Sequence, residues 1–480
     1  MCWGMDAFGV EWSCVCLELV EDYGVRIKNG KGDKSMKLTL DQTIYREDGM
    51  ENERGEILFE TDLEIENELV NLYPGIGYQE FEGFGGALTD AAGYVYAQMG
   101  DADKKKMLDS YFGKNGMGYT TVRIPVDSCD FSVEQFQAVE DAEDEAFQTF
   151  SLEREKKYIY PLWKDVEKAY GKEIEVMLSP WSPPAFMKTN GERSHGGSLK
   201  PECRERYAEY LCLYVKKLQE EGFRIKRMSI QNEPKAVQTW DSCIYSAEEE
   251  KVFLRDYLYP AMVRNGLENI ELFIWDHNKE RIFERACAII DETTDAMIKG
   301  IAFHWYSGDH FEAVKLVHEK FPDKKLILSE ACIEFSKYSA EGELENVKKY
   351  VHDIIGNFNA GMTAFYDWNI VLDGQGGPNH VQNFCDAPYI YHMEEKQLQE
   401  RYTKSAIGHF SHYLKPGAVR IAFSKYAEEL EVTAFRNPDD SLVAVVFNRS
   451  DRTLPLTVRV GDECASFEAE GFSVATAVIS

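Results

Sequence analysis

Short, β-rich apolar runs alternate with helical patterns from about residue 80 to about residue 400, and this rhythm constrains the fold more than any other feature of the sequence. Helical spacing of apolar residues is clearest at 203–221, 247–265 and 341–358. Several runs are apolar throughout, as expected of strands buried on both faces of a parallel sheet. The eight runs are 82–88 (EGFGGAL), 120–126 (TTVRIPV), 174–179 (IEVMLS), 227–231 (RMSIQ), 271–275 (ELFIW), 300–305 (GIAFHW), 325–329 (KLILS) and 362–368 (MTAFYDW).

Eight strands with intervening helices predict an α/β fold of the closed (β/α)8 type, a TIM barrel. An open doubly wound sheet is the alternative. A nucleotide-binding sheet of that kind carries GxGxxG after a strand, and the segment 83–86 (GFGG) does not match that pattern. A barrel typically takes about 250 residues, so a chain of 480 residues leaves room for a smaller second domain.

The two flanks alternate apolar and polar residues, which is typical of antiparallel strands. Such segments occur within 36–72 and again within 417–480, where 437–440 (NPDD) is a turn signal between two strands. We therefore predict a β-sandwich side domain built from both termini. The expected division is 1–77 for the N-terminal strands, 78–410 for the barrel and 411–480 for the C-terminal part of the sandwich.

Composition excludes several classes of partner. The formal net charge of −30 disfavours nucleic acid and anionic membrane surfaces. No apolar stretch of about 18 residues is present, and the first 22 residues lack the basic and apolar regions of a signal peptide. The 11 cysteines include no CxxC, which is typical of free thiols in a reducing compartment. We expect a cytoplasmic protein without a membrane anchor, metal or cofactor, and we make no prediction of its oligomeric state.

The predicted strands end in carboxylates, amides and aromatic residues, and barrel enzymes carry their active sites at these ends. Glu233 and Glu330 each follow an apolar strand, where a carboxyl group is costly unless it has a partner or a function. One interpretation is a pair of barrel salt bridges. The other is glycosidic-bond hydrolysis, which needs one carboxyl group as proton donor and one carboxylate that attacks or stabilises the sugar. The sequence shows neither zinc-ligand spacing nor a GxSxG nucleophile elbow.

An ordered set of motifs resembles the glucosylceramidase-like family of glycoside hydrolases, family 30, over about residues 65–480. The resemblance implies a retaining β-glycosidase acting on a β-linked glycoside or oligosaccharide through a covalent glycosyl-enzyme intermediate. The motifs are GFGGALTD (83–90), SCDFS (128–132), SPWSPP (179–184), KTNG (188–191), QNEP (231–234), HWY (304–306), SEAC (329–332), GGPN (376–379), GHFS (408–411) and VFNRS (446–450).

The resemblance also assigns roles to single residues. Glu233 would be the acid/base and Glu330 the nucleophile, and Arg123 would pair with carboxylates at the barrel mouth. Glu233 would then need a raised pKa. The substrate-binding residues would be Asp130, Trp181, Asn232, His304, Tyr306, Trp368 and Asn383. Trp240 lies in a loop that the resemblance does not cover, and we expect it to contact substrate and shape substrate choice.

Some positions and alternatives stay open at this stage. Asp276 and His277 end a predicted strand but match no family position that we can assign. The loops 191–199 and 235–241 are this chain's own and leave the substrate undetermined. A β-glucosidase or glucosylceramidase-like activity is favoured, and a β-xylosidase, an endo-β-1,6-glucanase, a glycolipid hydrolase at a membrane surface or a non-catalytic carbohydrate-binding protein are the alternatives.

Overall fold

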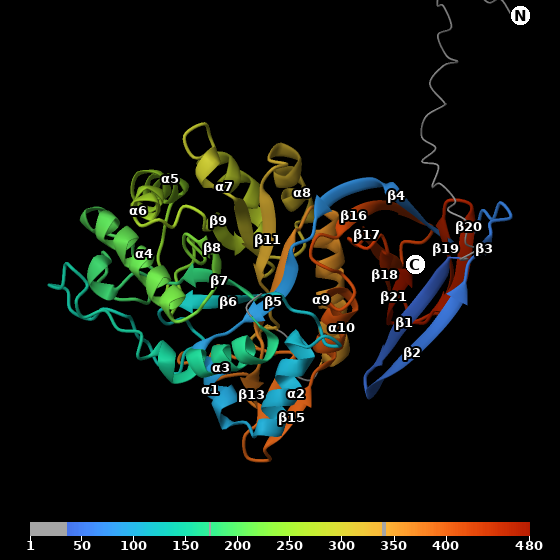
Figure 1. The fold of residues 1–480 in the computed structure, drawn as a ribbon, viewed down its shortest axis with the longest axis horizontal. Coiled ribbons are helices and arrows are strands. Elements are labelled where there is room, and N and C mark those ends of the chain that lie inside the picture. Colours follow the sequence, from blue (N-terminus) through green and yellow to red (C-terminus); the bar gives the residue numbers. More distant parts are fainter. Residues whose placement is uncertain (1–35, 172–173, 338–341) are drawn as a thin grey trace, which may run out of the picture.

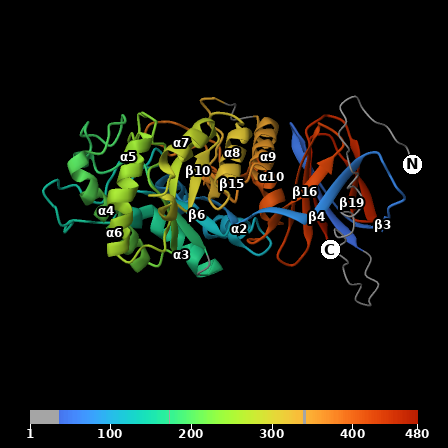
Figure 2. The same cartoon turned by 90° about the horizontal axis from the view of Figure 1, so that it is seen from above.

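A computed structural model describes residues 36–171, 174–337 and 342–480. The start of the chain, where we expected no export signal, lies outside these residues. In the part that is described, no helix is both long enough and apolar enough to cross a membrane. The described chain forms two bodies side by side, an α/β barrel and an all-β domain (Figures 1 and 2).

The first body is a closed barrel of parallel strands in the order β10-β11-β12-β5-β6-β7-β8-β9. Pairing of β12 with β5 closes it. Each strand overlaps one of the eight predicted runs, so the predicted (β/α)8 fold is confirmed. The strands are β5 Gly83–Ala87, β6 Thr121–Val126, β7 Glu175–Pro180, β8 Ile225–Ser229, β9 Glu271–Asn278, β10 Gly300–His304, β11 Lys325–Glu330 and β12 Ala364–Asn369.

Helices surround the barrel strands. The predicted helix at 247–265 is α5 and α6 joined by a π-helical segment, Phe253–Leu258. The α-helices are α1 Asp90–Gln98, α2 Asp101–Phe112, α3 Glu155–Tyr170, α4 Arg204–Glu220, α5 Ala247–Val252, α6 Tyr259–Arg264, α7 Ile282–Ile289, α8 Phe311–Lys320, α9 Glu343–Asn359 and α10 Tyr402–Ser411.

The barrel interior is filled by side chains rather than open. One layer consists of Met177, Phe273, Ala302, Ile327, Ala364 and Tyr366, all fully buried. Below it, at the amino-terminal end of the strands, the buried Arg227 lies within ion-pair distance of Glu82 and Glu271. The candidate site lies on the other side of this layer, at the carboxyl ends of the strands.

The second body is the predicted sandwich, built from both ends of the described chain (Figure 1). Its ten strands follow the order β2-β1-β21-β18-β17-β16-β4-β19-β20-β3, and the sheet folds over so that β20 packs against β2 and β18. The strands are β1 Lys37–Arg46, β2 Gly49–Leu58, β3 Glu60–Thr61, β4 Leu69–Glu80, β16 Val419–Lys425, β17 Leu430–Arg436, β18 Leu442–Asn448, β19 Leu454–Val460, β20 Glu463–Ala469 and β21 Ser473–Ile479.

Strand β4 connects the two bodies, because it pairs with β16 and β19 of the sandwich and leads directly into barrel strand β5. A small sheet that the sequence analysis did not anticipate follows β12. It consists of β13 (Leu372–Asp373), β14 (Tyr389–His392) and β15 (Gln397–Glu400). The loop between β13 and β14 contributes Asn379, Asn383 and Cys385 to the barrel mouth. The precise domain boundaries stay a prediction.

Candidate active site

Glu233 and Glu330 line one cavity at the carboxyl ends of the barrel strands. They come from different strand ends, since Glu330 is the last residue of β11 and Glu233 follows β8. The carboxylate of Glu233 is close enough to raise the pKa of Glu330. The cavity is also lined by most of the residues that we expected to bind substrate: Asp130, Trp181, Asn232, Trp240, Tyr306, Trp368 and Asn383.

Both oxygens of Glu330 accept hydrogen bonds. Arg123 Nη1 donates to Oε2 at 2.5 Å, and the Tyr306 hydroxyl donates to Oε1 at 2.9 Å. Arg123 is fully buried on β6, and Glu330 is 8% exposed. Two donors therefore hold this carboxylate in a fixed orientation at the edge of the cavity. Charge-assisted bonds of this kind favour the ionised form.

Arg123 connects Glu330 to the other strand ends. Its Nη2 donates to Asn232 Oδ1 at 2.9 Å and to Asp276 Oδ2 at 3.0 Å, and its Nε donates to Ser179 Oγ at 3.0 Å. A buried guanidinium needs such a full set of acceptors. Arg123 thus occupies the carboxylate-pairing position that the sequence analysis gave it.

Glu233 has a backbone conformation that is uncommon for a residue with a side chain. Its φ is 46°, in the left-handed region, and its backbone N–H donates to the Asp276 carbonyl at 2.9 Å. Its Oε1 lies 3.2 Å from His304 Nδ1, and the Gln238 side chain is a further hydrogen-bond partner. Strained backbone of this kind is often concentrated at functional sites.

His304 lies beneath Glu233 and is fully buried. Its Nε2 is 3.1 Å from Asp276 Oδ1, so the ring bridges two carboxylates. His304 is not among the residues that line the cavity, although we expected it to bind substrate. Its contacts instead place it as a support for Glu233.

Asp276 is the site residue that the sequence analysis could not assign. It bonds to Arg123 and His304, and it also accepts a hydrogen bond from Ser329 Oγ at 2.5 Å. Trp275 and Asp276 both have positive φ, and the register with β10 skips one residue here. Asp276 is thus the extra residue of a β-bulge, a device that reorients a side chain near an active site. The only sequence signal for it was a carboxylate at a strand end.

The charges around this cavity shift several pKa values. Burial would lower the pKa of His304, but Glu330, Asp276 and Glu233 raise it to about 9. Burial would raise the pKa of Glu233, but His277 and His304 lower it to about 2. For Glu330, burial and the charge of Glu233 raise the pKa, although His304 and Arg123 oppose them. These opposite shifts favour an imidazolium at His304 hydrogen-bonded to an ionised Glu233 over a neutral pair.

Trp181 and Trp368 stack on each other instead of presenting open faces to solvent. Their ring centroids are 5.3 Å apart with an interplanar angle of 23°, and each is 2% exposed. The Arg123 guanidinium lies 4.8 Å from the Trp181 centroid and 5.3 Å from that of Trp368. The pair forms part of the cavity wall and supports Arg123, because cation–π contacts stabilise a desolvated guanidinium.

Asp130 lies at another side of the cavity and is 6% exposed. Its Oδ2 accepts from Asn379 Nδ2 at 3.4 Å, and the Asn383 side chain is another hydrogen-bond partner. Burial and the charges of Glu330 and Glu233 raise its pKa well above the ordinary range. These influences favour the protonated form of the Asp130 carboxyl group, which can both donate and accept a hydrogen bond.

Comparison with known proteins places this geometry in a family. The model of the glycosyl hydrolase family 30 TIM-barrel domain matches residues 81–414, and that of the family 30 beta sandwich domain matches residues 417–477. Lysosomal acid glucosylceramidase of Mus musculus is 32% identical over 408 residues, which is 81% of this chain and 79% of the mouse protein.

Two solved structures extend the comparison. SrfJ from Salmonella typhimurium aligns with a TM-score of 0.88 and 35% identity, covering 92% of this chain and 99% of SrfJ. The endo-β1,6-glucanase BT3312 aligns with a TM-score of 0.81 and 25% identity, with the same coverage of each chain.

Proposed function

Because the chain belongs to glycosyl hydrolase family 30 and is thus a retaining glycoside hydrolase, we propose that it hydrolyses β-D-glucosides, with Glu330 as nucleophile and Glu233 as acid/base. The observation that carries the assignment is the orientation of Glu330. Arg123 and Tyr306 fix both of its oxygens while it lines the same cavity as Glu233.

In the first step, a Glu330 oxygen attacks the anomeric carbon while Glu233 protonates the leaving oxygen. A covalent glucosyl ester forms and the alcohol departs. In the second step Glu233, now a carboxylate, removes a proton from water, which attacks the anomeric carbon and releases Glu330. The predicted carboxyl separation is about 5–5.5 Å, the range of retaining enzymes. Asn232, held by Arg123, would bond the sugar hydroxyl next to the anomeric carbon.

The proton on His304 reconciles this mechanism with the lowered pKa of Glu233. An imidazolium beside an ionised Glu233 holds the same number of protons as a neutral imidazole beside a protonated Glu233. The Nδ1–Oε1 distance is 3.2 Å, so the proton can pass along an existing hydrogen bond. Substrate that displaces water would disfavour two facing charges and move the proton to Glu233. Asp276 would keep the ring in place throughout.

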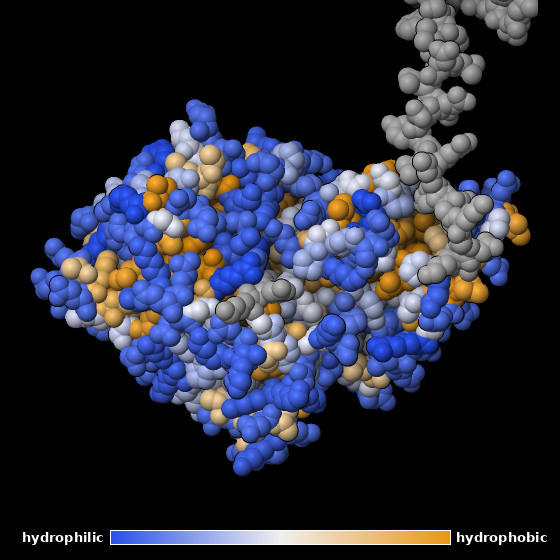
Figure 3. All heavy atoms as spheres, viewed as in Figure 1, coloured by the Kyte–Doolittle hydropathy of each residue, from blue (hydrophilic) through white to orange (hydrophobic). Residues whose placement is uncertain are grey.

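Glucose is the favoured sugar because the names of two similar proteins specify it. The mouse relative is a glucosylceramidase and BT3312 is an endo-β1,6-glucanase, so both names specify glucose units and the second specifies a β linkage. Family neighbours also include xylanases, which keeps β-xylosides as the second candidate. The face drawn in Figure 3 is largely hydrophilic, with apolar residues in small groups between the polar ones.

Initial rates on the 4-nitrophenyl β-glucoside, β-xyloside, β-galactoside and β-fucoside test the proposal. We expect the glucoside to be cleaved fastest, with β-glucose as the first-formed anomer in NMR spectra. Hydrolysis of the xyloside alone would replace the proposed sugar. If the protein cleaves none of the four glycosides and also leaves β-1,6-glucan intact, the proposed activity is contradicted.

The rate should depend on pH with two limbs. Glu330 must be ionised, so kcat/KM should fall as pH drops through its raised pKa, above the ordinary value of 4.5. The His304–Glu233 pair must keep one proton, so the rate should fall again as pH rises through about 9. Four titratable groups face His304, namely Glu233, Asp276, Glu330 and His277.

In His304→Gln we expect the alkaline limb to move to lower pH, because Glu233 loses its proton partner. The exposed His195→Gln should keep the wild-type profile. Prior incubation at each pH, followed by assay at neutral pH, separates titration from unfolding. An alkaline limb that His304→Gln leaves in place would contradict this proton assignment.

A further inference from the structure

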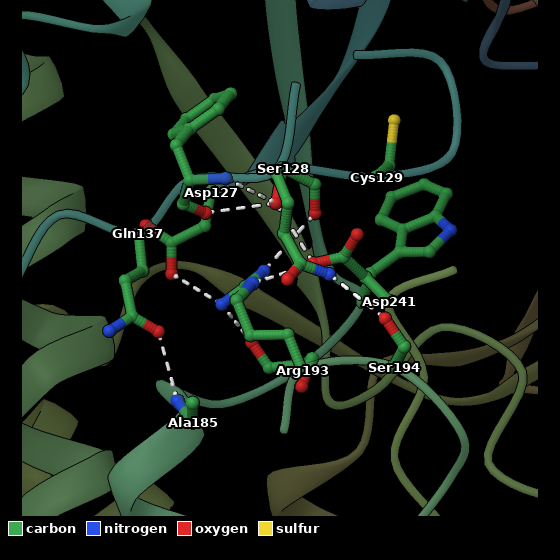
Figure 4. A network of polar contacts seen from close by, with 12 residues as sticks. Asp127, Ser128, Cys129, Gln137, Ala185, Arg193, Ser194 and Asp241 are labelled. Carbon is green, nitrogen blue, oxygen red and sulfur yellow. Dashed lines mark hydrogen bonds and ion pairs between the residues drawn. The ribbon is translucent and has the colours of Figure 1, made fainter. Parts of the chain in front are cut away.

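A buried arginine outside the catalytic group joins three segments near the cavity (Figure 4). The Arg193 side chain is 3% exposed, and its Nε donates to Asp241 Oδ1 at 2.6 Å. Its Nη1 lies 3.3 Å from Asp127 Oδ2, and its Nη2 donates to the Ser128 carbonyl at 3.2 Å. Asp127 and Ser128 follow strand β6, whereas Asp241 ends the loop after Glu233. A single side chain thus fixes two loops to the rim of the barrel.

The two loops are also bonded to each other along their backbones. Ser242 N donates to the Arg193 carbonyl at 2.9 Å, and His195 N donates to the Gln238 carbonyl at 2.8 Å. The fully buried Lys188 donates to the carbonyls of Arg193 and Ser242 at 2.9 and 2.5 Å. The loop 191–199 therefore acts as a brace for the loop 235–241.

The braced loop places two side chains at the cavity. Gln238 and Trp240 line it, while their neighbours Val237 and Thr239 are exposed. Gln238 hydrogen-bonds Glu233, and Trp240 packs against the aromatic cluster of the cavity wall. The loop contains neither helix nor strand of its own, so its conformation depends on these external bonds.

We propose that Arg193 is a positioning residue that holds Gln238 and Trp240 at the leaving-group side of the cavity and thereby sets which aglycones the enzyme accepts. The inference rests on the proposed function, because a general acid must contact the leaving oxygen and Gln238 contacts that acid. Residues braced beside Glu233 on this loop then meet whatever is attached to that oxygen.

The chemistry of the clamp requires a guanidinium. Its planar fork reaches Asp241 and Asp127 at once and still bonds three backbone carbonyls, which a lysine ammonium cannot match in geometry. Both carboxylates are 1% exposed, so removal of the cation leaves two buried carboxylates without the guanidinium that pairs with them. The loop would relax to hydrate them, and Gln238 and Trp240 would move with it.

The test uses the full chain with 4-nitrophenyl β-D-glucoside and octyl β-D-glucoside as probes. Arg193→Gln and Arg193→Lys are compared with Glu192→Gln, an exposed change on the same loop, and with Trp240→Ala. We expect the ratio of kcat/KM values, octyl over nitrophenyl, to change about tenfold in Arg193→Gln and Trp240→Ala, mostly through KM, as a displaced contact of ~1.4 kcal/mol requires. In Arg193→Lys we expect a ratio between those of Arg193→Gln and the wild type. In Glu192→Gln we expect the wild-type ratio.

Hydrogen exchange in 188–199 and 235–244 gives a readout that needs no activity. We expect faster exchange in both loops of Arg193→Gln and unchanged exchange in Glu192→Gln. Equal loss on both glucosides in Arg193→Gln, or unchanged exchange in 235–244, would overturn the proposal. If the wild type cleaves neither glucoside while the exchange result holds, the clamp stands and the proposed function fails instead.

Discussion

Glu330→Gln is expected to abolish turnover, lowering kcat/KM on 4-nitrophenyl β-D-glucoside by at least about 10⁴-fold. A glutamine amide cannot attack the anomeric carbon, so the covalent intermediate does not form. The amide keeps the shape of the carboxyl group and leaves a hydrogen-bond acceptor for Tyr306 or Arg123. The fold should therefore survive, and loss of activity can be assigned to the missing nucleophile.

A glutamate at the opposite end of the barrel provides the matched control. Glu271 begins β9, is half-buried and pairs with Lys325 at 2.7 Å. Glu271→Gln removes a comparable ion pair away from the cavity, and we expect near-normal kcat with some loss of thermal stability. A fluorinated glucoside that reacts slowly should form a lasting ester on Glu330. The protein mass should then rise by one sugar unit in the wild type and in Glu271→Gln, but not in Glu330→Gln. Turnover by Glu330→Gln above one-hundredth of the wild-type rate would contradict the nucleophile assignment.

Periodicity was enough to predict the barrel. Each run that became a barrel strand is apolar because helices cover its outer face and side chains fill its interior, so burial on both faces appears directly in the sequence. Boundaries shifted by one to three residues: the run 271–275 extends to Asn278 in β9, and the run 227–231 only overlaps β8, which spans Ile225–Ser229. Strand ends depend on tertiary pairing, which a short run does not encode.

The sandwich was also predictable in outline, because one face of each strand meets solvent and alternation results. The small sheet of β13, β14 and β15 was not. Its strands are two to four residues long, too short to establish a period, and β13 pairs with β14 across the loop that carries Asn379 and Asn383. That loop contacts the segment around Asp130 through tertiary hydrogen bonds, which the sequence does not reveal.

For the site, the family resemblance indicated the two glutamates and a carboxylate-pairing Arg123, but the contacts of Asp276 and His304 could not be predicted. Asp276 acquires its contacts through a bulge with two positive-φ residues, and Trp275 is not a residue type that signals such a conformation. The same limit applies to His304, whose burial beneath Glu233 cannot be distinguished in sequence from a position at the cavity surface. The expectation of a raised pKa for Glu233 likewise omitted the two histidines beside it.

Glu233→Gln should separate substrates by their leaving groups. With a poor leaving group such as methyl or glucosyl, we expect kcat/KM to fall by about 10²–10⁴-fold, the usual contribution of a general acid. With 2,4-dinitrophenyl β-D-glucoside, the first step needs no proton and should keep most of its rate. The second step loses its base, so the glucosyl ester on Glu330 should accumulate and appear as a burst of dinitrophenol.

Azide provides the decisive measurement for this variant. It is a nucleophile that needs no deprotonation, and removal of the Glu233 charge lessens the repulsion of an anion at the cavity. Added azide should therefore restore turnover of the dinitrophenyl glucoside and yield β-glucosyl azide, because attack on the Glu330 ester inverts a centre that was inverted once before. The same substrate without azide, and wild type with azide, are the controls. Equal losses on all leaving groups, or the α-azide as product, would remove Glu233 from the acid/base role, since only an acid/base acting opposite a covalent Glu330 ester predicts both results.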